Sequence, residues 1–153
     1  MRDKVHFLVS CLLLSAAAGC AQGPCEPPST CPEGSALAED GLSCVDGEGR
    51  RQGPAAFFHE DGSCGLATFR DGLVEGEWAL YWPDGGLRSQ VSYRRGAEHG
   101  PWRLYHPGGR PHVEGAYWHG RRDGEWRRYA PDGRLAGTAR YERGRLLPAG
   151  AAP

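Results

Sequence analysis

Four histidines lie close together in this 153-residue chain and could, by type and spacing, bind a metal ion: His99, His106, His112 and His119. Imidazole nitrogens are common ligands of Zn²⁺, but a site needs several of them around one point. In a hairpin that turns at residues 107–110, we expect His112 to face Tyr105, which places His106 and His112 on opposite faces of the strands. The sequence therefore predicts scattered surface histidines, with no metal site and no other cofactor.

Residues that could carry out catalysis form no recognised arrangement. Asp84 and Asp132 each lie between a proline and a glycine, a position typical of turns and not of an acid–base pair. No combination of serine or cysteine with histidine and a carboxylate is apparent. The glycines separate predicted strands and open no helix, so they predict neither a phosphate-binding loop nor a dinucleotide site. We expect a protein that is not an enzyme.

Four cysteines are suited to disulfide bonds: Cys25, Cys31, Cys44 and Cys64. An even number of cysteines in an exported protein predicts two bridges, for which three pairings are possible. The alternative is a zinc site, but there is no C-x-x-C pair and no nearby histidine to support one. Residues 20–48 are rich in proline and polar residues and have no periodicity. We therefore expect an irregular tether stapled by these bridges.

Residues 1–19 have the pattern of an export signal. Two basic residues precede an apolar run at residues 5–14, which is too short to span a membrane permanently, and small residues follow it. Residues 17–20, Ala-Ala-Gly-Cys, resemble a bacterial lipobox. That resemblance implies cleavage before Cys20 and attachment of a diacyl lipid to its thiol.

The alternative interpretation of this signal is an ordinary secretory peptide cut after Ala18. That cut leaves five cysteines, one of them unpaired, whereas lipidation of Cys20 leaves an even set of four. We therefore expect a protein that is exported and lipid-anchored in the bacterial cell envelope. Because Ala21 and not aspartate follows Cys20, we expect the outer membrane.

Charge is unevenly distributed along the chain. Residues 20–99 contain six arginines and 13 acidic residues, a net charge of −7, whereas residues 100–153 contain ten arginines and five acidic residues, a net charge of +5. Two interpretations of these arginines are possible: they only keep the outer face of the sheet solvated, or they bind an anionic ligand. We favour the first. A nucleic-acid ligand is not expected for an exported protein. Five arginines could contact an anionic lipid headgroup or polysaccharide: Arg103, Arg121, Arg122, Arg127 and Arg128.

All of these side chains must be positioned by a repeat of 24 residues that occupies residues 49–147. Each unit contains Gly-x-Trp-x-x-Tyr and ends on a further tyrosine; a less regular copy with phenylalanines precedes them at a spacing of 23. Such a fixed period predicts an array of one small supersecondary unit. The repeated aromatic residues are Trp78, Tyr81, Tyr93, Trp102, Tyr105, Tyr117, Trp126, Tyr129 and Tyr141.

Each unit is predicted to be a β-hairpin. Apolar residues alternate at residues 78–82 and again at residues 87–93, which is the period of a strand. Pro-Asp-Gly at residues 83–85 provides a turn between the two runs. The sequence thus predicts an all-β meander of about eight antiparallel strands over residues 49–147, without helices. A flexible tail is expected at residues 148–153.

The register of these strands predicts a ladder of tryptophans on one face of the sheet. Trp78 and Trp82 are expected to share that face, because they are separated by an even number of residues. Trp102 lies in the middle unit and is expected to be among the best covered. Trp126 is expected to be more exposed, because Arg128 stands where the preceding units have leucine.

The pattern G-x-W-x-x-Y-x-x-x-G, followed by Y-x-x-G-x-x-x-G, resembles the bacterial variant of the MORN repeat found in proteins called YwqK-type antitoxins. The resemblance extends from Gly49 to about Leu147, some two thirds of the chain. It implies repeated β-hairpins and an interaction or scaffolding role. It carries over no catalytic residue.

Two functions of different classes are consistent with these features. The first is an envelope lipoprotein whose repeat sheet docks a protein partner, with an immunity or antitoxin role as a special case. The second is binding of anionic lipid headgroups or polysaccharide through the arginine-rich half. The two differ in salt response, because binding through arginines weakens steeply with ionic strength and binding through an aromatic face does not.

Overall fold

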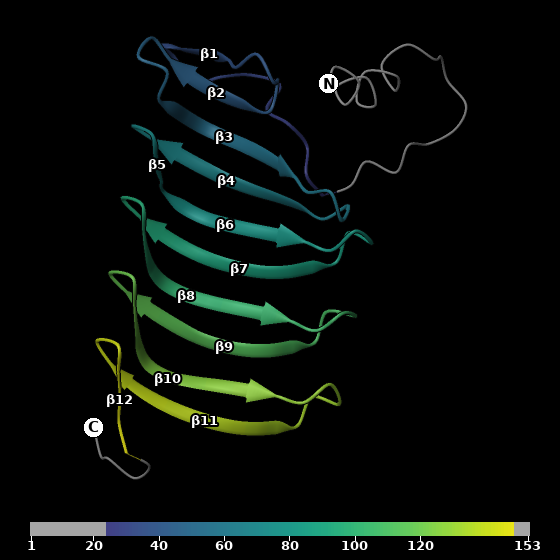
Figure 1. The fold of residues 1–153 in the computed structure, drawn as a ribbon, viewed down its shortest axis with the longest axis vertical. Helices are drawn as coiled ribbons and strands as arrows, with labels where there is room; N and C mark the ends of the chain where they lie inside the picture. The colour runs from purple at the N-terminus through teal and green to yellow at the C-terminus, as the bar shows by residue number, and fades with distance from the viewer. Residues whose placement is uncertain (1–23, 149–153) are drawn as a thin grey trace.

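The structure, a computed structural model, describes residues 24–148, which form one antiparallel sheet of 12 strands (Figure 1). Strands that follow one another in the chain pair with each other, except that β4 pairs with both the two-residue β5 and β6. The sheet is a single curved layer, and none of the described residues forms a helix. The strands are β1 (Ser35–Leu37), β2 (Ser43–Asp46), β3 (Arg51–Phe58), β4 (Cys64–Arg70), β5 (Leu73–Val74), β6 (Gly76–Tyr81), β7 (Leu87–Arg94), β8 (Ala97–Tyr105), β9 (Pro111–Trp118), β10 (Arg121–Tyr129), β11 (Leu135–Glu142) and β12 (Arg145–Leu146).

The hairpins of the repeat close with the predicted Pro-Asp-Gly chemistry. Between β6 and β7, Gly85 has a φ of 85° and donates its N–H to the carbonyl of Trp82 at 2.9 Å. The Asp84 carboxylate accepts the N–H of Gly86 at 2.9 Å, and Asp132 accepts the N–H of Arg134 at 3.0 Å in the last unit. Both aspartates therefore form turns, as the sequence predicts.

The opposite ends of these strands are joined by two-residue turns of type I′. In this turn both central residues have positive φ, and its twist matches that of a hairpin. Arg95 and Gly96, for example, have φ of 50° and 77°. In three of the four turns, the first N–H of the turn donates to a side chain that lies 19 or 20 residues earlier in the chain. The pairs are Arg95 with Glu75 at 2.6 Å, Arg143 with Asp123 at 3.0 Å, and Asp71 with Gln52 at 3.1 Å.

Side chains alternate between the two faces of the sheet, and the register collects the large rings on one of them. Trp78 pairs with Val91, and Val91 pairs in turn with Trp102. The buried core is small and lies near the N-terminal end, where Ala55, Ala67 and Phe69 form a cluster. A single layer has no second layer to pack against, so the rows of side chains along one face must contribute much of its stability.

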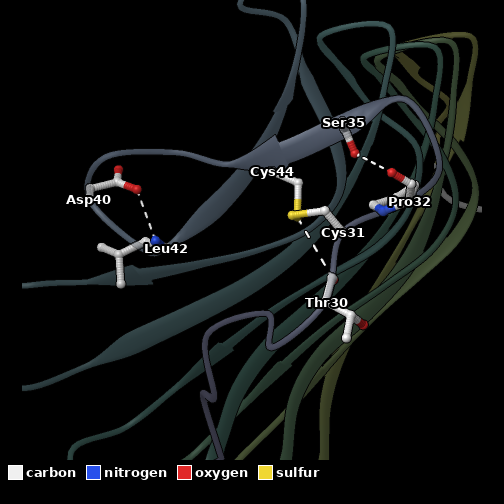
Figure 2. The surroundings of a disulfide bond; sticks show 7 residues. All are labelled: Thr30, Cys31, Pro32, Ser35, Asp40, Leu42 and Cys44. Atoms are coloured by element: carbon white, nitrogen blue, oxygen red, sulfur yellow. Dashed lines mark hydrogen bonds between the residues drawn. A yellow bond between two sulfur atoms is a disulfide. The ribbon is translucent and has the colours of Figure 1, made fainter.

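The stapled N-terminal segment contains a hairpin that the sequence does not predict. Strands β1 and β2 pair with each other, and β2 pairs with β3, so residues 35–46 extend the sheet instead of forming an irregular tether. These strands have only three and four residues, too few for a periodic pattern to reveal. Ser35 Oγ donates to the carbonyl of Pro32 at 2.7 Å, and Leu42 N–H donates to Asp40 at 2.8 Å (Figure 2).

Both predicted disulfide bonds are present, and the structure selects one of the three possible pairings. Cys31 is bonded to Cys44 in β2, and Cys25 is bonded to Cys64 at the start of β4. The first bond ties the beginning of the segment to its own hairpin (Figure 2). The second ties the segment to the end of the β3–β4 hairpin.

The all-β meander predicted from the sequence is confirmed. The eight long strands, β3, β4 and β6 to β11, correspond to the eight predicted, and four short strands add to them. The predicted signal peptide, Cys20 and most of the predicted tail lie outside residues 24–148. Within that range, no helix is long and apolar enough to cross a membrane.

Candidate interaction face

One face of the sheet carries most of the large rings, and we call it the aromatic face. Its rings contact one another along the sheet: Phe57 stacks on Trp78 with centroids 5.3 Å apart, and Trp102 lies 5.3 Å from Trp126. All 12 strands of residues 24–148 belong to one sheet, so no second sheet and no helix among these residues covers this face. The aromatic face is defined by Phe57, Phe69, Trp78, Tyr93, Trp102, Tyr117, Trp126 and Tyr141.

Trp126 is the best-buried ring of the repeat, with 5 % of its surface exposed, whereas Trp102 is half-buried. The expectation that Trp126 is the more exposed of the two is therefore wrong. The reason lies in its neighbours in the adjacent strands: Ala139 pairs with Trp126, and Gly115 is so close that a Cβ there would overlap the indole. The fit against these two small residues outweighs the presence of Arg128 on the same strand.

A row of residues at the start of each repeat lies beside the rings of the aromatic face. The last aromatic residue of each unit pairs with a member of the row across the type I′ turn, as Tyr117 does with Arg122. Each member precedes the tryptophan of its unit by four positions, but the residue type changes, so the sequence analysis misses this row. We call it the covering row; its members are Val74, Glu98 and Arg122, with Arg51 and Leu146 at the equivalent positions of the first copy and of β12.

The covering row differs in chemistry from unit to unit. Arg122 places its guanidinium 4.6 Å from the ring centre of Trp126 and donates to the Tyr141 hydroxyl at 3.2 Å. Arg51 lies 5.4 Å from the ring centres of both Phe57 and Phe69. A cation over an aromatic face is attracted by the ring quadrupole, so both arginines are held on the rings of their own units.

The middle unit has a carboxylate, Glu98, at this position. Glu98 pairs with Tyr93 across the turn and is half-buried. Burial raises the pKa of the Glu98 carboxyl above its ordinary value. The pKa of the Tyr93 hydroxyl is also raised, first by burial and then by the charges of Glu98 and Tyr117. Among residues 24–148, no arginine or histidine forms an ion pair with Glu98.

The opposite face, which we call the polar face, carries ion pairs and also the exposed rings of Phe58 and Trp118. Arg103 lies 3.9 Å from Glu114 across β8 and β9, and Arg127 forms an ion pair with Glu125 on its own strand. The Tyr129 hydroxyl donates to Glu114 at 3.0 Å. Of the nine repeated aromatic residues, Tyr81, Tyr105 and Tyr129 lie on this face, and the remaining six lie on the aromatic face.

The five arginines proposed to contact an anionic ligand are not gathered in one place. Arg103 and Arg127 lie on the polar face, each beside a glutamate. Arg122 lies on the aromatic face over Trp126, and Arg128, two residues further along β10 than Trp126, shares that face. Arg121 lies at the start of β10, beside the turn at Gly144. The structure thus distributes these charges over both faces.

Two of the four histidines are closer together than the sequence predicts. His106 and His112 stack with ring centres 4.2 Å apart, so their assignment to opposite faces is wrong. The pairing shifts register here: Leu104 pairs with Val113 but Tyr105 with Pro111, which leaves His112 as an extra residue and breaks the alternation. His106 Nε2 lies 3.1 Å from the carbonyl oxygen of Tyr129.

The same register shift follows Leu80 and Arg128, so it is a feature of the repeat. After the shift in the second unit, Trp82 packs against Arg88, whose guanidinium lies 4.5 Å from its ring centre. In residues 24–148, no group of three or more His, Cys, Asp or Glu side chains is arranged to hold a metal ion.

The repeat is similar to a known family of protein repeats. Residues 74–95 and 122–143 match the MORN repeat variant family. The two segments are the second and fourth units, and each begins at a member of the covering row. Repeats of this family generally contact proteins or membranes. No curated protein matches the chain.

Proposed function

We propose that this chain is a non-enzymatic envelope lipoprotein whose aromatic face binds a protein partner. In this proposal the lipid on Cys20 holds the sheet at a bacterial membrane, which is the outer membrane because Ala21 follows the lipidated cysteine. Because Cys25 is bonded to Cys64 in the first hairpin of the repeat, the residues between Cys20 and Cys25 would connect the lipid to the sheet. The family match to an interaction repeat supports the binding role.

The observation that carries the proposal is a row of large rings on one face of a single-layer sheet. Trp78, Trp102 and Tyr117 are each half-buried, although they belong to the most apolar part of the repeat. Contiguous apolar surface of this kind marks interaction sites in soluble proteins. Tryptophan and tyrosine are also enriched at the centres of protein interfaces, where they contribute most of the binding energy.

The distribution of the arginines favours a protein partner over an anionic ligand. A polyanion is bound best by several cations that converge on one surface, but these five are spread over two faces. Glu114 and Glu125 already lie beside two of them. Binding through the aromatic face therefore agrees better with the geometry.

Affinity capture with two matched variants tests the proposal. Leu80 and Leu104 lie on the aromatic face, each two residues after a tryptophan of that face. Leu80→Ser/Leu104→Ser therefore removes apolar surface from the aromatic face, and Arg103→Gln/Arg127→Gln removes charge from the polar face. We expect the wild type and the arginine variant to retain the same envelope protein at low and high salt, and the leucine variant to lose it. Melting curves exclude loss by unfolding. Loss in the arginine variant, or a steep loss with salt in the wild type, would move the binding site to the charged residues.

The anchoring part of the proposal has a separate test. Cys20→Ser removes the thiol that the lipid would occupy. We expect this variant to leave the membrane fraction and to lack the intact-mass increment of a diacylated protein. A Cys20→Ser protein with the same mass increment and the same membrane fraction as the wild type would contradict anchoring through this residue.

A further inference from the structure

Two units of the repeat place an arginine of their own over their aromatic rings. Arg51 lies on Phe57 and Phe69 in the first copy. Arg122 lies 4.6 Å from the ring centre of Trp126 and 5.4 Å from that of Tyr141 in the last unit. In both, a cation occupies the electron-rich face of a pair of rings.

The middle unit has the same rings but the opposite charge. Glu98 precedes Trp102 by four positions and pairs with Tyr93, as Arg122 precedes Trp126 and pairs with Tyr117. The repeat thus places Trp102 and Tyr117 in the same relation to Glu98 as Trp126 and Tyr141 have to Arg122. A carboxylate gains nothing from an aromatic face, because the negative side of the ring quadrupole repels it.

Within residues 24–148, Glu98 has no ion-pair partner and no cation lies over the rings of Trp102 and Tyr93, although Arg122 adjoins Tyr117. Its carboxyl is half-buried, and burial raises its pKa, so the ionised group lacks compensation there. Trp102 is half-buried and accessible from the open side of the sheet. A cation at this point would satisfy the carboxylate by charge and the rings by cation–π attraction.

We propose that the Glu98 cluster, made of Glu98, Tyr93, Trp102 and Tyr117, binds an arginine side chain of the protein that docks on the aromatic face. The guanidinium would occupy the position that Arg51 occupies in the first copy and Arg122 in the last unit. Arginine suits this place better than lysine, because its planar group pairs with a carboxylate and stacks on rings at the same time. This inference rests on the proposed function and specifies the chemistry of the partner.

A peptide titration tests the inference directly. The probes are acetyl-Gly-Arg-Gly-amide and the same peptide with norleucine or lysine in place of arginine, followed by the NMR signal of the Trp102 indole N–H. We expect saturable binding of the arginine peptide to the wild type, weaker binding of the lysine peptide and none of the norleucine peptide. Equal shifts with the norleucine peptide would overturn the role of the charge.

Three variants locate the binding. Glu98→Gln keeps the shape of the side chain and removes its charge, and it should weaken binding of the arginine peptide by about tenfold or more. Glu98→Arg places at this position the residue that the last unit has there, Arg122; it should abolish binding, while the far-UV circular dichroism of the strands remains unchanged. Glu77→Gln makes the same charge change on the polar face of β6 and should have no effect. Unchanged binding to Glu98→Gln would contradict the inference.

The outcomes separate this inference from the proposed function. If capture of the partner depends on Leu80 and Leu104 but the arginine peptide does not bind, the proposed interaction face is supported. The inference about the Glu98 cluster is then contradicted. Capture that does not depend on these leucines would contradict the interaction face, and the peptide titration would still decide whether Glu98 binds a guanidinium.

Discussion

Trp126 is buried against small residues of the adjacent strands. Gly115 and Ala139 leave room in the adjacent strands, and Arg122 covers the ring from the open side. Tyr117 adds an edge-on contact with ring centres 5.2 Å apart. Burial at this point depends on the sizes of residues that are far apart in the sequence.

Truncating Trp126 should therefore destabilise the protein more than truncating Trp102. Trp126→Ala should lower the free energy of unfolding by about 3–5 kcal/mol, and Trp102→Ala by clearly less, because Trp102 is half-buried. Denaturant unfolding of the two variants measures the difference. An equal loss, or a larger loss for Trp102→Ala, would contradict the packing of Trp126 against its small neighbours.

Gly115 gives an independent test of the same contact. Gly115→Ala adds a methyl group that overlaps the ring of Trp126, and it should cost about 1–3 kcal/mol of unfolding free energy. Gly137→Ala is the matched control, because it also lies in a long strand but its added Cβ meets no atom within 4 Å. That variant should unfold with nearly wild-type stability. Equal losses of stability in the two variants would show that the contact with Trp126 is not the reason for a glycine at position 115.

Asp46 makes the turn between β2 and β3 sensitive to acid. Its carboxylate accepts hydrogen bonds from the N–H of Arg50 at 2.9 Å and of Glu48 at 3.0 Å, and from Gln52 at 3.2 Å. These bonds, with that of the Arg50 N–H largest, lower the pKa of Asp46 to about 2.

A depressed pKa in the folded state stabilises the fold only where the carboxylate is ionised. The contribution of Asp46 should be present above its unfolded pKa of 3.8 and lost as the pH falls through about 2. Asp46→Asn should therefore reduce the difference in melting temperature between pH 5 and pH 2. The same acid dependence in Asp46→Asn as in the wild type would assign it to other carboxylates.

At the scale of strands and turns, the predictable part of the fold is the part with a period. The alternation of apolar residues and the Pro-Asp-Gly turns are sufficient to predict the eight long strands. The type I′ turns are not predictable in detail, since arginine and histidine stand at their first positive-φ position at Arg95 and His119. These residues are tolerated because the strands on both sides fix the turn.

The side-chain arrangement is predictable only in part. Alternation places most rings correctly, but His112 is an extra residue in β9 between the partners of Leu104 and Tyr105, which breaks the alternation and brings His106 onto His112. The pairing of the cysteines and the strands of β1 and β2 have no sequence signal of their own. The role that we propose for Glu98 rests on its comparison with Arg122 at the same position of the next unit, which the sequence pattern alone does not suggest.

The two disulfide bonds act on one end of the sheet. Cys25 and Cys64 are 39 residues apart, and Cys31 and Cys44 are 13 apart. In a chain-entropy description each disulfide bond contributes about 3–4 kcal/mol to the free energy of unfolding, and the bond that closes the longer loop contributes more. We expect Cys25→Ser/Cys64→Ser to be less stable than Cys31→Ser/Cys44→Ser.

Amide hydrogen exchange shows how far this loss extends. Each repeat contacts only its neighbours, so protection of β9, β10 and β11 should stay close to that of the wild type in both variants. Thiol labelling of the unfolded, unreduced wild type should detect neither pair. Exposure of β10 amides in either variant would show that the sheet unfolds as one unit and not from its N-terminal end.

Considered as a whole, the molecule is a thin sheet with two chemically different faces. One presents tryptophan and tyrosine rings with a single carboxylate among them, and the other presents arginine–glutamate pairs. Within residues 24–148, no second layer of strands or helices covers either face, and the disulfide-bonded segment packs against the N-terminal end of the sheet. Our proposal places the protein partner on the aromatic face.

Photo-crosslinking in producing cells tests that assignment most directly. Benzoylphenylalanine replaces Tyr117 on the aromatic face or Tyr105 on the polar face; both are half-buried tyrosines of the repeat in adjacent strands. We expect a discrete crosslinked partner from position 117 and not from position 105. The same partner from position 105 alone, or equal crosslinking from both positions, would contradict an interaction through the aromatic face.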